Sequence, residues 1–170
     1  MFPRTATFVF IQLLLTLAEE RYYPELRSDL QDFQDHSRCY PDVGEWYQIY
    51  RNYYTDPDFG GTAKCVKYQA YGTYENFSTP AAFSYGSTVP GSVPGRYTMS
   101  STPCYTGKNL GTFVPDKDPG RVQEEWNVIY TDCDTCFIAR HRYADNGYGC
   151  TYWRRVSSFH DDGDCCEFIY

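Results

Sequence analysis

The sequence lacks the signatures of the common catalytic and membrane-spanning classes. Its three histidines, His36, His141 and His160, have no metal-ligand spacing, so we expect each to be a solvated surface residue. It has no Gly-x-Ser-x-Gly elbow and no glycine loop that would cradle a phosphate. After residue 18, no segment approaches the roughly 20 apolar residues of a transmembrane helix. We therefore expect a protein that is not an enzyme, has no metal or cofactor, and is not embedded in a membrane.

The sequence also lacks any run of Lys or Arg, and its formal net charge is −7. An acidic surface repels phosphate backbones and anionic headgroups. We expect no nucleic-acid partner and no membrane surface as a partner. A cationic ligand is compatible with this charge.

The chain shows no internal repeat and no linker that would divide it, which predicts one domain. Its first residues read as a secretory signal: Arg4 is the positive end, an apolar run covers residues 8–17, and Thr16-Leu17-Ala18 is a cleavage site. We predict a signal peptide at 1–18 and a secreted, extracellular domain at 19–170.

Eight cysteines behind an export signal predict disulfides, because the compartments outside the cytosol are oxidising. Spacing alone leaves about 105 pairings open. Cys133-Asp-Thr-Cys136 has redox spacing, but the strand-rich chain lacks the βαβ context of thioredoxin-like chemistry. Asn76-Phe77-Ser78 is a glycosylation acceptor.

Apolar and aromatic residues alternate in short segments separated by turn residues, which predicts an all-β domain. Leu26, Leu30 and Phe33 predict one short N-terminal helix. Eight strands joined by hairpins avoid open edges by closing into an antiparallel up-and-down barrel with room for one small ligand. A two-sheet sandwich is the alternative. The strands are expected near residues 46–54, 63–71, 82–86, 95–100, 110–114, 124–132, 135–143 and 150–157.

Four segments together resemble the tick salivary lipocalins of the histamine-binding family. They are the aromatic strand and Asp-Pro-Asp-Phe-Gly turn of residues 47–68, Trp126-Asn-Val-Ile-Tyr-Thr-Asp-x-Asp-x-Cys136, Gly149-Cys150-Thr-Tyr-Trp153, and Cys165-Cys166-Glu-Phe-Ile-Tyr. The resemblance covers most of the chain after residue 18. It implies a monomeric eight-stranded lipocalin barrel, secreted in saliva, that sequesters histamine, serotonin or a small lipid mediator of the host.

The resemblance places Tyr53, Asp56 and Phe59 at the barrel mouth, with Phe59 in place of a pocket tryptophan. An ammonium in a barrel needs a carboxylate to replace its hydration, and ring faces add cation–π attraction. Asp56 is the first candidate, although an Asp before Pro often only starts a turn. The second is Glu124 or Glu125 beside Trp126. The predicted ligand-binding residues are Tyr53, Asp56, Phe59, Glu125 and Trp126.

Other positions depart from the family pattern. The expected Asp-Ala-Trp reads Gln34-Asp35-His36, and Phe137 and Thr151 stand where acidic residues would have served a second amine site. We therefore expect no second amine site. Trp153 is expected to be a barrel-closing ring covered by an arginine, and Trp46 to plug the closed end.

The resemblance also implies disulfide pairs. Cys136 would pair with Cys166 and Cys39 with Cys165, which leaves Cys65 without its usual partner. Relatives continue past this ending into a helix and another cysteine, so the C-terminal helix is expected to be truncated at Tyr170.

Two functions follow. The first is capture of a host biogenic amine or small lipophilic mediator, without turnover. The second is binding of a host immune protein through the loops, because the Gly/Pro/Ser-rich stretch of residues 78–101 reads as mobile hairpin tips.

Overall fold

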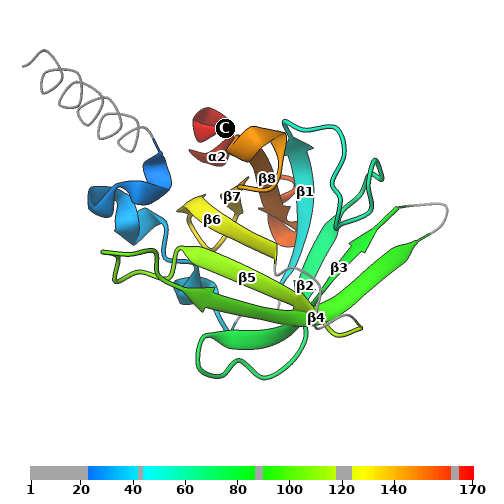
Figure 1. Ribbon diagram of the computed structural model, residues 1–170, viewed down its shortest axis with the longest axis horizontal. Helices are drawn as coiled ribbons and strands as arrows, with labels where there is room; N and C mark the ends of the chain where they lie inside the picture. The colour runs from blue at the N-terminus through cyan, green and yellow to red at the C-terminus, as the bar shows by residue number, and fades with distance from the viewer. Residues whose placement is uncertain (1–22, 42–43, 87–89, 118–123, 162–164) are drawn as a thin grey trace, which may run out of the picture.

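The chain folds into one closed eight-stranded antiparallel barrel, in which each strand pairs with the next in sequence and β8 pairs with β1 (Figure 1). A computed structural model describes residues 23–41, 44–86, 90–117, 124–161 and 165–170. The predicted signal peptide lies outside the described residues. The strands are β1 (Glu45–Arg51), β2 (Lys67–Ala70), β3 (Ser78–Tyr85), β4 (Gly91–Ser100), β5 (Leu110–Pro115), β6 (Glu124–Thr131), β7 (Cys136–His141) and β8 (Gly149–Arg155). The predicted up-and-down barrel is confirmed, and the sandwich is wrong.

Alternation along each strand separates the interior from the outer face. On β3, Thr79, Ala81 and Phe83 are buried while the residues between them are partly exposed. A period of two places alternate side chains inside a barrel, so aromatic residues at these positions fill it. The sequence pattern therefore fixes which rings meet at the centre.

The predicted N-terminal helix is a series of 3-10 helices: η2 (Pro24–Leu26), η3 (Ser28–Phe33) and η4 (His36–Cys39). Asp35 interrupts the series, because its carboxylate accepts hydrogen bonds from Ser37 N–H and from Ser37 Oγ–H. Side-chain bonds of this kind compete with a continuous α-helix. The N–H of His36 donates to Lys108 O at 3.1 Å, which docks η4 against the barrel.

The stretch of residues 78–101 forms the β3–β4 hairpin, in which eight consecutive residue pairs face each other. The expectation of mobile hairpin tips over this whole stretch is wrong. Its two prolines are accommodated because their carbonyls still accept ladder bonds: Tyr71 N–H donates to Pro80 O, and Asp116 N–H donates to Pro94 O. Residues 87–89, at the tip, lie outside the described residues.

Asn76 is exposed in a two-residue turn between Glu75 and Ser78. Asn76 and Phe77 have φ of 51° and 59°, the left-handed region that Asn tolerates better than most residues. The exposed side chain is compatible with the acceptor triplet, and its glycosylation stays a prediction.

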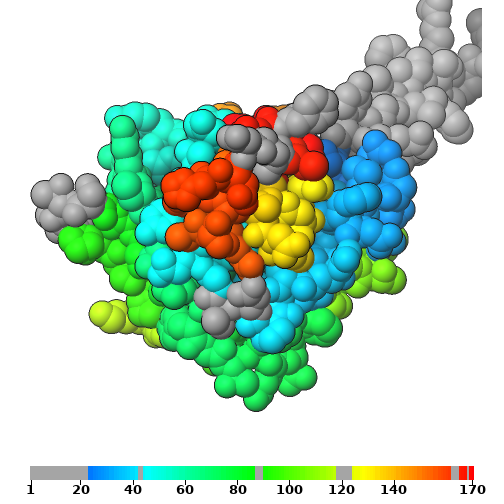
Figure 2. All heavy atoms as spheres, turned by 180° about the vertical axis from the view of Figure 1, so that it is seen from behind, coloured from blue at the N-terminus to red at the C-terminus, as the bar shows by residue number. Residues whose placement is uncertain are grey.

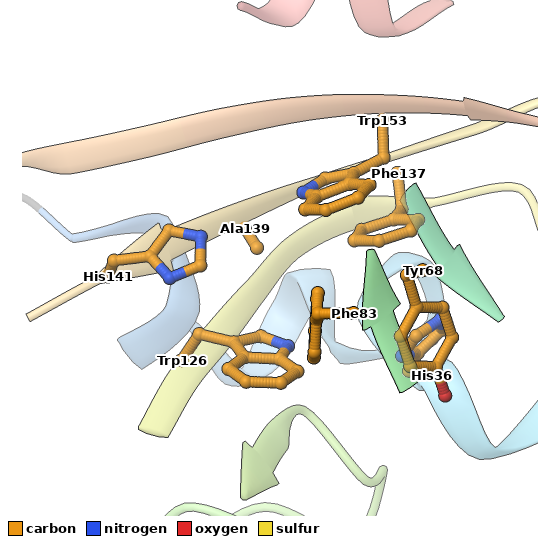
Figure 3. Close-up of a pocket in the computed structure, with 8 residues that line it drawn as sticks. All are labelled: His36, Tyr68, Phe83, Trp126, Phe137, Ala139, His141 and Trp153. Atoms are coloured by element: carbon orange, nitrogen blue, oxygen red, sulfur yellow. The ribbon is translucent and has the colours of Figure 1, made fainter. Parts of the chain in front are cut away.

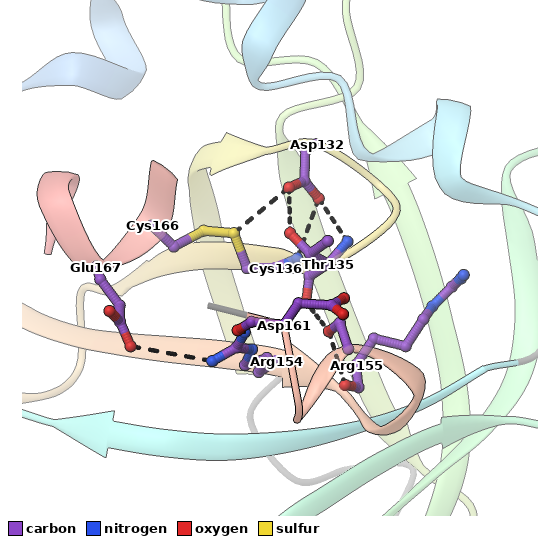
Figure 4. A network of polar contacts seen from close by, with 9 residues as sticks. Asp132, Thr135, Cys136, Arg154, Arg155, Asp161, Cys166 and Glu167 are labelled. Atoms are coloured by element: carbon purple, nitrogen blue, oxygen red, sulfur yellow. Dashed lines mark hydrogen bonds and ion pairs between the residues drawn. A yellow bond between two sulfur atoms is a disulfide. The ribbon is translucent and has the colours of Figure 1, made fainter. Parts of the chain in front are cut away.

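One cysteine of each disulfide lies in or next to the β6–β7 turn, and Figure 4 shows the Cys136–Cys166 bond. Cys136 is bonded to Cys166 of α2 (Cys165–Ile169), the pair that the resemblance implied. Cys39 is bonded to Cys133 and not to Cys165, so that pairing is wrong. Cys133 and Cys136 therefore have two separate partners, and their redox-like spacing serves a structural turn. The free cysteines are Cys65, Cys104, Cys150 and Cys165.

Asp132 shapes this turn. Its Oδ1 accepts hydrogen bonds from the N–H groups of Asp134, Thr135 and Cys136. Burial would raise the pKa of Asp132, but these bonds outweigh it and lower the pKa below its usual value. Seen from behind, the C-terminal segment in orange and red and the N-terminal segment in blue lie against yellow β6 (Figure 2). The two disulfides thus fasten both ends of the described chain to one side of the barrel.

Trp46 closes the barrel beside η4. It is buried, its ring meets Phe137 at 5.3 Å, and the guanidinium of Arg155 lies 5.0 Å above it. The prediction that Trp46 plugs the closed end is supported by these contacts. In the part of the chain that the structure describes, we find no helix with the length and apolar character to cross a membrane.

We predict that peptide mapping under non-reducing conditions links Cys39 to Cys133. The sequence separation is 94 residues, and closing a loop of that size stabilises the folded state by about 4–5 kcal/mol in the chain-entropy model. The double variant Cys39→Ser/Cys133→Ser should lose up to this free energy of unfolding in urea. Cys104→Ser, which removes an exposed free thiol, is the control and should be neutral. A Cys39–Cys165 peptide would contradict the pairing.

Candidate functional site

A narrow cavity runs through the barrel interior between His36 at one end and His141 at the other (Figure 3). Its volume is about 10 Å³. That is room for about one water molecule. The interior is thus nearly filled by its own rings. Its lining consists of His36, Tyr68, Phe83, Trp126, Phe137, Ala139, His141 and Trp153.

Phe83 is the central ring of the cavity. It meets Trp126 at 5.8 Å and Trp153 at 6.0 Å, both edge-on, and meets Tyr68 at 5.2 Å. Two parallel stacks frame it: Phe137 on Trp153 at 5.6 Å and Tyr97 on Trp126 at 5.3 Å. Offset stacks and edge-to-face contacts are the preferred ring geometries. The cavity offers flat ring faces on several sides.

His36 forms the end nearest η4. It is buried, and its Nδ1 lies 2.9 Å from the hydroxyl of Tyr97. Burial lowers the pKa of His36 to about 4, although the charge of Asp35 opposes the shift. The ring is therefore neutral at pH 7.

His141 forms the other end. Its Nε2 lies 2.7 Å from Thr151 Oγ1, which also accepts the indole N–H of Trp153 at 2.8 Å. Burial lowers the pKa of His141 to about 4, against the opposing charge of Asp56. The expectation of surface histidines is wrong for both residues, and only His160 is exposed. The alternation of Phe137, Ala139 and His141 along β7 was the signal that places His141 inside.

Asp56 lies in the loop between β1 and β2 and is only 2% exposed. Its Oδ1 accepts the N–H groups of Asp58 and Phe59, both at 3.0 Å. Its Oδ2 accepts the hydroxyls of Tyr53 at 3.0 Å and Tyr143 at 3.3 Å. Both oxygens are thus engaged by protein donors. The carboxylate starts the turn and is not among the residues that line the cavity.

Phe59 and Tyr53 are brought to this end of the barrel by the same loop. Phe59 packs 4.0 Å from Phe83, so the loop inserts a ring against the central ring of the cavity. Tyr53 meets the ring of His141 at 6.0 Å. Burial and the nearby charge of Asp56 raise the pKa of Tyr53 above its usual value. Arg51 also pins the loop by donating to Gly61 O at 3.0 Å.

Glu125 and Trp126 are the two β6 residues that were predicted to bind the ligand. Of these, only Trp126 lines the cavity. Glu125 is exposed on the outer face, because the strand pleat turns successive side chains to opposite sides. It does not line the cavity. Glu124, its neighbour, is the buried acid of the two.

Trp153 also lines the cavity, a position that its expected role as a barrel-closing ring did not include. The covering arginine, Arg155, lies over Trp46 instead. Phe137 and His36 line the cavity at positions that depart from the family pattern, and Thr151 holds His141 in place. Among the described lining residues, none carries a carboxylate.

Comparison with known proteins now identifies the family. Residues 27–170 match the family described as tick histamine binding protein. The chain belongs to this family. No curated protein matches it. Among solved structures, AM182 in its serotonin complex is 17% identical, with a TM-score of 0.53, over 81% of this chain and 80% of that one. The siderocalin Ex-FABP is 15% identical, with a TM-score of 0.44, over 75% and 80% of the two chains.

The first of these likenesses shows a shared fold. This member of the tick histamine-binding family has a closed barrel with an aromatic interior and neutral histidines at both ends of its cavity. The described residues contain no group of three His, Cys, Asp or Glu side chains placed to hold a metal ion.

We predict that Asp56→Ala lowers the free energy of unfolding by about 2–4 kcal/mol, because it strands two backbone N–H groups and two tyrosine hydroxyls. Urea unfolding measures the loss. The matched control is Asp116→Ala in the β5–β6 connection, where the carboxylate is exposed. Equal effects of the two substitutions would contradict the role of Asp56 in holding the loop.

We predict that acid destabilises the fold through His36 and His141. Their folded pKa of about 4 lies below the unfolded value of 6.5, so the unfolded chain binds more protons as pH falls between these values. Stability is therefore full above pH 6.5 and falls by roughly 2–3 kcal/mol per histidine by pH 4.5. Urea titrations at several pH values measure this. His141→Phe should remove about half of the loss, since His36 still contributes its share, and His160→Phe should leave it unchanged. A flat wild-type profile would refute the assignment.

Proposed function

We propose that the protein captures one small mediator inside its barrel, stoichiometrically and without turnover. The ring-lined cavity between His36 and His141 is the observation that carries this function. Concave sites lined by aromatic side chains with few polar groups are typical of small-ligand binding. No catalytic constellation occurs among the cavity-lining residues that the structure describes.

Size restricts the guest. The free space is about that of one water, so a guest enters only if rings move aside. Phe59 is the ring that a guest would displace most easily, because it comes from a loop and packs against Phe83. A small, flat molecule that slides between ring faces requires the least displacement. This geometry favours an aromatic or small lipophilic mediator over a long, bulky one.

The lining also restricts the charge that a guest can carry into the cavity. An ammonium among the cavity rings would lose its hydration without meeting a carboxylate, since the described lining residues carry none. The buried acids Asp56 and Glu124 lie outside that lining. Ring faces supply cation–π attraction, but each contact contributes only roughly 0.5–2 kcal/mol. We infer that a biogenic amine binds with its ring inside and its ammonium at the mouth. A neutral aromatic or lipophilic guest meets no such restriction.

The family and one structural neighbour support a host amine or related mediator as the guest. The family is described by histamine binding, and the neighbour AM182 is bound to serotonin. Release into saliva, and hence action on a host, rests on the apolar N-terminal run and on the disulfides. The alternative, a loop-based binder of host immune proteins, is less favoured because Ser78–Tyr85 and Gly91–Ser100 form paired strands.

We predict that serotonin, histamine or a neutral indole changes the tryptophan emission saturably, with one guest per chain. Trp126 and Trp153 line the cavity, so a guest that contacts their rings alters their environment. Fluorescence titration of the oxidised protein measures this, and calorimetry gives the stoichiometry.

A blocking variant sharpens the test. Ala139 lines the cavity and is 1% exposed, so Ala139→Leu fills the remaining space and should abolish binding. Ala82→Leu makes the same change on a part-exposed site of β3 and should leave binding intact. Circular dichroism checks that both variants fold. No binding to the wild type by any of these amines or indoles, or by fatty acids, would refute the proposal, as would full binding by Ala139→Leu.

A further inference from the structure

A second pocket lies on the outside of the barrel, where η2 packs against β6 and β7. Its volume is about 310 Å³, within the range of sites that hold small molecules, and it shares no lining residue with the cavity between the histidines. Leu26 and Arg142 are exposed, so the pocket opens to solvent. Its lining consists of Tyr23, Glu25, Leu26, Arg140, Arg142 and Gly147.

The walls of this outer pocket are held in place by the protein itself. Asn109 Nδ2 donates to Glu25 O at 3.1 Å, and this bond ties η2 to the barrel. Gln34 Nε2 donates to Pro24 O at 2.8 Å, and both amide side chains are fully buried. Another wall is the β7–β8 turn, where Gly147 has a φ of 92°, a value that favours glycine. A guest therefore meets a preformed surface.

Arg140 is held in the outer pocket from two sides. Its Nε lies 2.6 Å from Glu25 Oε1, and its guanidinium carbon lies 4.7 Å above the ring of Tyr23. Its two terminal nitrogens donate to no described residue and, unlike Nε, are not buried. The ion pair and the ring contact therefore orient the guanidinium and leave its outer edge accessible. Oε2 of Glu25, by contrast, is buried, so this carboxylate does not meet a guest.

Arg142 brings a second guanidinium to the same lining. No described carboxylate pairs with it: Glu25 is engaged by Arg140, and Asp145, the nearest acid along the turn, does not line the pocket. Two arginines and one glutamate leave one net positive charge in the lining. Because this charge is accessible, the pocket attracts an anion locally, although the chain as a whole is acidic.

We propose that the outer pocket binds a small organic acid, a molecule with an apolar body and one carboxylate. The planar fork of a guanidinium matches the two oxygens of a carboxylate, so Arg140 and Arg142 hold the head group. Tyr23 and Leu26 supply the apolar wall for the body. A single negative charge also matches the net charge of the lining.

This inference does not rest on the proposed function. The described lining of the barrel cavity contains neither Lys nor Arg and consists mainly of rings, so it offers an anion no partner. The outer pocket offers two. We therefore expect the two sites to be filled independently, by guests of different charge.

Calorimetry at low ionic strength tests the outer pocket, because salt screens the charge of an exposed arginine. The probes are octanoate, with a chain as its apolar body, and 3-phenylpropanoate, with a ring. Octanol and 3-phenylpropanol are their uncharged counterparts. We expect at least one of the two acids to bind the wild type with one molecule per chain outside the barrel.

Arg142→Gln removes one guanidinium, and the exposed position lets the fold persist, as circular dichroism checks. The affinity of the acid should fall about tenfold, since charged hydrogen bonds are lost, while any binding of the alcohols stays unchanged. Arg142→Lys should recover part of the affinity, because it keeps the charge and loses the fork. Arg96→Gln, at an exposed arginine of β4, is the matched control and should bind the acid as the wild type does. Ala139→Leu should also do so, because that change lies inside the barrel.

Three results would overturn the inference and leave the barrel proposal standing. They are no binding by either acid, an unchanged affinity in Arg142→Gln, and loss of acid binding in Ala139→Leu, which would place the acid inside the barrel. The barrel proposal fails separately, if Ala139→Leu abolishes the binding of no guest, whatever the outer pocket binds.

Discussion

The packing of rings around Phe83 is the constraint on which this molecule depends. An eight-stranded barrel has an interior just wide enough for side chains to fill. Here the filling is aromatic: Phe83 meets rings from β2, β5, β6 and β8, and Phe59 from the first loop. These contacts stabilise the empty barrel, because they bury large apolar surfaces at close range. They also occupy the volume that a guest needs. Stability and binding therefore compete for one space, and affinity depends on how little energy the displaced rings lose.

The two ends of the barrel are held together by different kinds of contact. At the end beside η4, the Cys39–Cys133 disulfide, the docked His36 and the ring of Trp46 hold the chain covalently or by burial. At the other end, the β1–β2 loop is held by one carboxylate and one arginine, through hydrogen bonds that can break and reform. Local opening takes place where contacts are fewest and least covalent. Under the proposed function, a guest would enter past Asp56 and Phe59, at the end held only by hydrogen bonds.

The sequence predicted the barrel because that prediction needs only alternation and turn chemistry, both local. The family resemblance, and not alternation, placed Phe59 at the barrel mouth, and alternation alone left open which face of the Trp126 strand points inward. Its errors concern positions where local pattern is ambiguous. Glu124 and Glu125 are adjacent, so an error of one residue in the pleat selects the wrong acid. The partner of Cys39 depends on which segment passes beside it in three dimensions, which spacing does not encode. His36 and His141 read as surface residues because a titratable side chain is usually solvated, and only their pairing with Tyr97 and Thr151 permits burial.

Histidine suits this interior better than an acid would. A carboxylate facing the rings would need several donors to offset its lost hydration, as Asp56 obtains from its loop. A neutral histidine needs only one acceptor and one donor, and burial keeps it neutral at physiological pH. It can therefore present a directional polar group to a dry cavity without introducing a charge. At one end of the cavity the protein itself engages the Nδ1 of His36, through Tyr97. At the other end Nδ1 of His141 makes no hydrogen bond with the described residues. The two ends of a nearly uniform cage of rings therefore differ in their polar contacts.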